Sequence, residues 1–116
     1  MKLNFQLAAA ALLGAFVFAA PLAVPAAADD STMNVNYAGD HFSPQNLSVP
    51  AGQPLTLRVS NNGKRTIEFE SFKLNREKVV EPGETILVHL NSLTPGSYDF
   101  YDDFNQDVPQ GTIVAR

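Results

Sequence analysis

Cysteine and tryptophan are both absent from the 116 residues. Without cysteine, the chain can form neither a disulfide nor a metal site with a thiolate ligand. Basic residues are also scarce, because 8 Lys and Arg face 12 Asp and Glu, which gives a formal net charge of -4. This acidic balance argues against nucleic acid and anionic membrane surfaces as partners, and it suits a cationic ligand.

Long apolar runs are missing as well. The run from Leu7 to Ala20 follows the positive charge of Lys2 and is shorter than the ~18 residues that a membrane span needs. It is typical of a secretory signal peptide rather than an uncleaved anchor, and Ala26-Ala27-Ala28 fits the small-residue cleavage pattern. We therefore predict a cleaved signal peptide at residues 1–28, a single domain at residues 29–116, and export to a bacterial periplasm.

No stretch of the predicted mature chain has a convincing helical period. Instead, apolar and polar residues alternate in short segments, most clearly where Leu55, Leu57 and Val59 share one face. Seven or eight such segments, separated by turns rich in Pro, Gly and Asn, predict an all-β Greek-key β-sandwich. The predicted core consists of Leu55, Leu57, Val59, Ile67, Phe69, Ile86, Val88, Leu90, Tyr98, Phe100 and Ile113.

The segment from residue 95 to 116 combines a Pro-Gly turn, a strand with alternating aromatic residues, two adjacent acids and a closing strand. This layout resembles the last two strands of a cupredoxin, the small β-sandwich of blue copper proteins. In that family the first of these strands leads to a copper-binding Cys, followed by a His and a Met. The corresponding places here hold Asp102, Asn105 and a residue near Gln110. The resemblance implies a cupredoxin-like scaffold without type 1 copper.

Further motifs indicate a particular family of cupredoxin-like proteins. They include Glu-Phe-Glu-Ser at 68–71, Glu-Lys-Val-Val at 77–80, Pro-Gly at 82–83 and Asp-Asp-Phe at 102–104. In order and spacing, nearly all of the mature chain resembles the EfeO-type cupredoxin-like family. Members are periplasmic and are associated with bacterial iron uptake through a membrane permease. The resemblance implies an iron or copper ion as ligand, and a membrane iron permease or another periplasmic uptake component as partner.

Carboxylates suit hard cations such as Fe(III), and Cu(II) also accepts oxygen donors. The family pattern assigns its motif glutamate to Glu70 and the acid at the former Cys place to Asp102. In a cupredoxin the loops around these positions meet at one pole of the sandwich, which would bring Glu70 close to Asp102 and Asp103. We expect these three residues to bind a metal ion, with Glu77 as a fourth oxygen donor. Secondary candidates are Glu68, Asn105 and His41.

The same acids permit a function of another class. Acidic residues at strand ends and in loops are commonly solvated, so the domain could dock without a metal on a permease or partner enzyme through an acidic face. We do not expect an enzyme, because the sequence holds no Ser-His-Asp or Cys-His arrangement. A metal titration separates the metal-binding module from the docking module.

Overall fold

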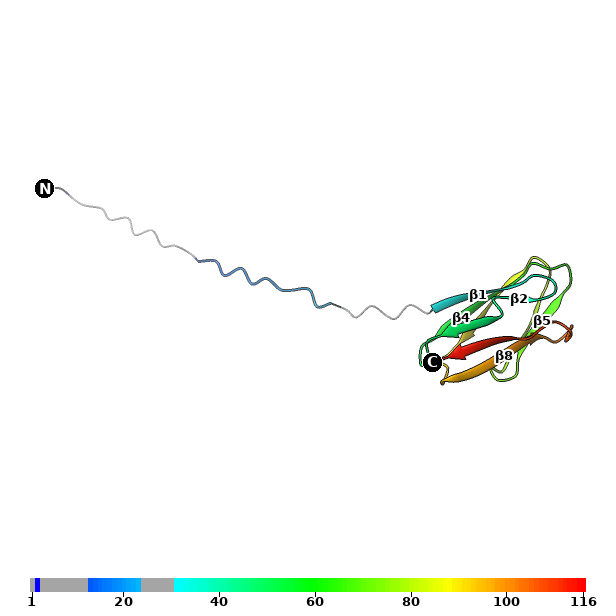
Figure 1. The fold of residues 1–116 in the computed structure, drawn as a ribbon. Coiled ribbons are helices and arrows are strands. Elements are labelled where there is room, and N and C mark those ends of the chain that lie inside the picture. The colour runs from blue at the N-terminus through cyan, green and yellow to red at the C-terminus, as the bar shows by residue number, and fades with distance from the viewer. Residues whose placement is uncertain (1, 3–12, 24–30) are drawn as a thin grey trace.

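The computed structural model describes residues 2, 13–23 and 31–116. Within them lie nine strands, all between residues 31 and 116 (Figure 1). Residues 13–23 form neither a helix nor a strand, and no described segment is a helix of the length and hydropathy that crossing a membrane requires. The predicted cleavage site at Ala26-Ala27-Ala28 lies outside the described residues.

The strands form two sheets that face each other in a β-sandwich. The first sheet has the order β2 (Phe42–Ser43), β1 (Ser31–Tyr37), β4 (Leu55–Asn61) and β7 (Thr85–Leu90). The second has the order β3 (Asn46–Val49), β9 (Gly111–Ala115), β8 (Gly96–Asp102), β5 (Ile67–Ser71) and β6 (Arg76–Val80). Strands β1 and β4 are parallel, as are β3 and β9, and the other pairs are antiparallel. The all-β prediction is confirmed, and the two-residue β2 is the strand that alternation did not indicate.

Hydrophobic side chains from both sheets fill the space between them. The predicted core residues are buried, except that Ile86 and Tyr98 are only half-buried and pack at its edge. The core also takes in Phe42, Leu74 and Val108, which were not predicted. Two of these lie in turns, where a single apolar residue shows no alternation, and Phe42 lies in the shortest strand.

Three phenylalanine rings meet at the centre of this core. The ring centroid of Phe100 lies 5.1 Å from that of Phe42 and 5.4 Å from that of Phe69. On its other side, the Phe100 ring packs against the bare backbone of Gly111, where an added Cβ would lie 2.1 Å from Cζ of the ring. The aromatic core therefore requires glycine at this position of β9.

The side chain of Asn61 stabilises the connection from the first sheet to the second. Its side-chain amide is buried and donates to the backbone oxygens of Arg65, at 2.7 Å, and Val80, at 2.9 Å. Its Oδ1 accepts a hydrogen bond from the N–H of Gly63 at 3.0 Å. Because Arg65 precedes β5 and Val80 ends β6, this one amide fixes both ends of the β5–β6 hairpin.

Candidate metal site

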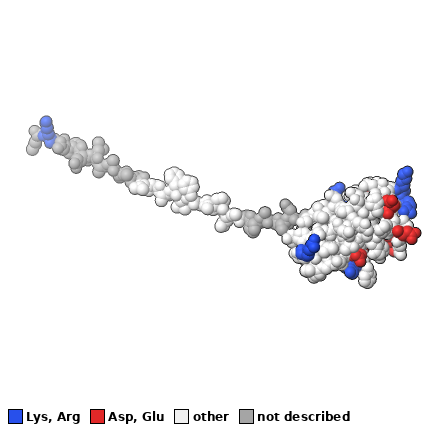
Figure 2. All heavy atoms as spheres, in the orientation of Figure 1, with Lys and Arg blue, Asp and Glu red and all other residues white. Residues whose placement is uncertain are grey.

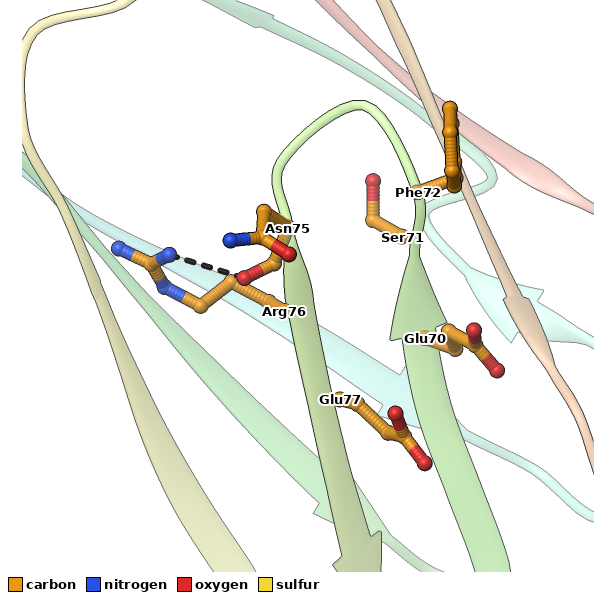
Figure 3. Close-up of a pocket in the computed structure, with 6 residues that line it drawn as sticks. All are labelled: Glu70, Ser71, Phe72, Asn75, Arg76 and Glu77. Carbon is orange, nitrogen blue, oxygen red and sulfur yellow. Dashed lines mark hydrogen bonds between the residues drawn. The ribbon is translucent and has the colours of Figure 1, made fainter.

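Alternation along β5 sends two glutamates to the outer face of the second sheet. Ile67 and Phe69 are buried and point into the core, so Glu68 and Glu70 point the other way. Glu70 is the register partner of Glu77 on β6, and Figure 3 shows their carboxylates side by side. Together with Ser71, Phe72, Asn75 and Arg76, the two acids line a small cavity of about 110 Å³.

The outer face also receives an acid from the end of β8. Asp103 follows this strand directly, and its backbone N–H donates to the backbone oxygen of Glu68 at 2.9 Å. One carboxylate oxygen each from Glu68, Glu70 and Asp103 lies within 4.8 Å of the others. Oxygen ligands stand about 2.0–2.6 Å from a bound metal ion, so one ion could contact all three after small side-chain movements.

Glu68 is the most enclosed of these acids, with only 8% of its surface exposed. Burial is the largest cause that raises the pKa of its carboxyl from 4.5 to about 7. A hydrogen bond with the Glu77 carboxyl and the negative charges of Glu77, Asp103 and Glu70 raise this pKa as well. In the described part of the chain, the one ion pair joins His41 to Asp40, so no Lys or Arg neutralises the cluster by a salt bridge.

Tyr101 lies next to the acids on the same face, because it is the register partner of Glu70 on β8. Burial raises the pKa of its hydroxyl, as do the charge of Glu70, a hydrogen bond with that carboxyl, and the charges of Asp103 and Glu77. With Gln106 and Gln110, Tyr101 lines a second cavity of about 290 Å³. Sequence reasoning missed this residue, although alternation along β8 places it on one face with Asp103.

Asp102 does not join the cluster, which corrects the expected convergence with Glu70 and Asp103. It is the register partner of Phe69 on the core side and is only 1% exposed. Its Oδ1 accepts hydrogen bonds from the backbone N–H groups of Glu68, at 3.1 Å, and Phe104, at 3.0 Å. The structural reason for the difference is that β8 continues through Asp102, so the two adjacent acids point to opposite faces.

The remaining candidates are placed as follows. Glu77 lies beside Glu70 and Glu68, as the prediction of a fourth oxygen donor requires. Asn105 lies in the turn after β8, where its backbone N–H donates to the backbone oxygen of Asp102 at 3.2 Å. His41 lies in the β1–β2 turn and is outside the acidic cluster, with Nδ1 2.5 Å from Oδ1 of Asp40.

Comparison with known proteins shows the family of the chain. A family model described as the cupredoxin-like domain matches residues 8–115. The chain belongs to the cupredoxin-like domain family. An uncharacterized protein of Rickettsia prowazekii (strain Madrid E) is 41% identical over 78 residues, which make up 66% of this cupredoxin-like chain. The matched segment is 62% of that relative's length.

Several solved structures share the fold. Auracyanin A, a blue copper protein from Chloroflexus aurantiacus, has a TM-score of 0.63 at 18% identity and covers 75% of this chain and 99% of its own. The metal-binding domain of the Cu(I)-exporting P-type ATPase CopA from Streptococcus pneumoniae D39 has a TM-score of 0.62 at 9% identity. The match covers 73% of this chain and 84% of that domain. At these identities the likeness establishes the fold alone. The cupredoxin-like domain described here has no cysteine, so it lacks a type 1 copper site.

Proposed function

We propose that this cupredoxin-like domain is a periplasmic metal-binding module of the EfeO type. It handles iron, or copper, for a membrane iron permease or another periplasmic uptake component, and it acts as a binding protein rather than an enzyme. The observation that carries the proposal is the buried glutamate Glu68 and the acids around it. Glu68 is 8% exposed, its hydrogen-bond partner is the acid Glu77, and two further acids surround it.

Such an arrangement is unfavourable in the absence of a cation. Burial penalises the charged form of Glu68, and like charges placed directly opposite across strands, such as Glu70 and Glu77, destabilise a sheet. Burial first, and the neighbouring acids second, penalise the charged form, which is why the pKa of Glu68 rises to about 7. A multivalent cation would relieve the repulsion, because it attracts all of the carboxylates at once.

The donor set indicates which cation suits the site. Glu68, Glu70, Glu77 and Asp103 offer only carboxylate oxygens, which favour hard ions. Fe(III) fits this chemistry best, and Cu(II) also accepts oxygen donors. Copper is named for proteins with the same fold, among them auracyanin A and the CopA domain. Here the absence of a thiolate favours binding and delivery over electron transfer by a blue-copper site.

The alternative is a metal-free domain that docks on a permease or partner enzyme through the same acids. Docking of that kind needs an acidic surface that a basic partner can cover. On the face of the molecule in Figure 2, acidic and basic side chains are interspersed rather than segregated. Glu68 would contribute little to docking, because the residue as a whole is only 8% exposed. The metal-binding module therefore accounts for more of the site.

Calorimetric titration of the chain from Asp29, which contains the nine strands found in the described residues, tests the proposal. Fe(III) supplied as its nitrilotriacetate complex should bind at one site per chain, and Cu(II) should compete for that site. The double variant Glu68→Gln, Glu70→Gln should lose binding, whereas Asp107→Asn, which removes an exposed acid outside the cluster, should retain it. A wild-type protein that binds neither ion would refute the metal role and leave the docking module.

A further inference from the structure

We propose that Tyr101 is a ligand of the same site, and that its phenolate oxygen makes the site prefer Fe(III) to divalent ions. This inference rests on the proposed function and adds to it a donor that the acidic motifs do not contain. It begins from the placement of the tyrosine in the sheet. Tyr101 is paired with Glu70 across β8 and β5, and register partners point to the same face.

The side chain of Tyr101 lies on the same face as the expected ligands. It is next to Glu70 on the neighbouring strand, and Asp103, two residues further along the chain, faces the same way. Glu70 in turn supplies one of the three oxygens that lie within 4.8 Å of one another. Tyr101 therefore adds an oxygen beside Glu70, while Glu68 contributes an enclosed carboxylate to the same cluster.

The chemistry of the phenol determines the choice of metal. A tyrosine phenol has an ordinary pKa of about 10, so it carries its proton at neutral pH. A bound cation favours the anionic phenolate, and a trivalent ion does so most strongly. On binding, the phenolic O–H bond breaks, the proton leaves to water and an Fe–O bond forms, while the iron stays ferric. Anionic phenolate is a hard donor that matches Fe(III).

The surface around Tyr101 leaves room for the ion to enter. Tyr101, Gln106 and Gln110 line the cavity of about 290 Å³ on this side of the site. The Gln106 Nε2 donates a hydrogen bond to Oδ1 of Asp103 at 2.9 Å, which holds that carboxylate at the edge of the cavity. The cavity therefore lies beside Tyr101 and, through Gln106, next to the carboxylate of Asp103.

Absorption spectroscopy tests the inference, because Fe(III) bound to phenolate gives a broad charge-transfer band in the visible range. We expect this band when the chain from Asp29 is titrated with Fe(III)-nitrilotriacetate, and we expect Tyr101→Phe to abolish it. Loss of a group that only hydrogen-bonds to a metal ligand costs about 10–100-fold in metal affinity, so loss of this direct ligand should weaken Fe(III) binding by at least about tenfold. Cu(II) affinity should change less.

Tyr98→Phe is the matched control. Tyr98 lies on the same strand with its side chain on the opposite face, and its hydroxyl donates to the backbone oxygen of Thr94 at 2.7 Å. This variant should keep both the visible band and the affinity. Iron binding without a visible band, or a band that persists in Tyr101→Phe, would overturn the phenolate ligand and leave the metal site standing. Absence of iron binding in the wild type would overturn both.

Discussion

Asp102 and Asp103 are adjacent in the chain and lie on opposite faces of the same sheet. Asp102 faces the core, where its Oδ1 accepts the backbone N–H groups of Glu68 and Phe104. Asp103 faces outward and joins Glu68 and Glu70. One acid of the pair thus positions the backbone that carries the cluster, while the other belongs to the cluster itself.

Asp102→Ala should therefore destabilise the fold. It leaves two backbone donors without their acceptor, at a cost of roughly 1–3 kcal/mol for each buried group. Asp102→Asn keeps an acceptor oxygen and should cost much less, and it should retain most of the metal affinity. Denaturant unfolding and metal titration of the two variants measure these effects. Loss of metal binding in a well-folded Asp102→Asn protein would instead make Asp102 a ligand, as the family pattern implies.

Stability without metal should depend on pH through Glu68. Its pKa is about 7 in the folded protein and 4.5 for an unperturbed glutamate, so the folded state holds the proton more tightly than the unfolded chain does. The resulting stabilisation is fully present below pH 4.5 and is lost as the pH rises to about 7. The urea midpoint should fall across this window in the wild type.

Glu68→Gln should remove that fall, because glutamine does not titrate. Glu84→Gln serves as the control, since Glu84 lies in the exposed turn before β7 and accepts a hydrogen bond from the N–H of Glu81. If the profile of Glu68→Gln between pH 4.5 and 7 matches that of the wild type, Glu68 is not the titrating group.

Gly111→Ala should be among the most damaging small substitutions in this domain. The added methyl would lie 2.1 Å from Cζ of Phe100, so either the ring or strand β9 must shift. Overpacking of this kind costs typically about 1–3 kcal/mol, and for a domain of this size each kcal/mol lowers Tm by roughly 4–8 °C. Phe100→Leu in the same chain should recover part of the loss. A Tm of Gly111→Ala equal to that of the wild type would show that the ring moves freely.

Copper spectroscopy should distinguish this site from those of its blue relatives. With no cysteine in the chain, a Cu(II)-loaded sample should lack the intense blue band of a thiolate site, whatever its affinity. Titration with Cu(II) under visible absorption measures this directly. An intense band of the blue type would mean that another group supplies the charge transfer and that the oxygen donor set is incorrect.

Sequence periodicity was sufficient to predict the β-sandwich fold, and the family pattern predicted part of the candidate metal site. Alternation placed Leu57 and Phe100 in the core, and both are fully buried. The family pattern made Glu70 a ligand and left Glu68 as a secondary candidate. The structure makes Glu68 the more enclosed of the two.

The rest of the site depends on where β8 ends and on which residues pair across strands. The sequence does not show that β8 continues through Asp102, and this extension turns that carboxylate inward. The pairing of Tyr101 with Glu70 is a long-range contact between strands distant in the chain, so no local pattern reveals it. Asn61 is a similar case, because its bond to Val80 spans 19 residues.

The hairpin of β5 and β6 makes the acidic cluster inseparable from the hydrophobic core. A slip of one residue in β5 would turn Ile67 and Phe69 out to water and carry Glu68 and Glu70 into the sandwich. The large loss of apolar burial penalises every such alternative register. The spacing of the acids is thus fixed by residues that do not contact the ion. A substitution of Phe69 would therefore disturb the geometry of the site as much as a change in one of its carboxylates.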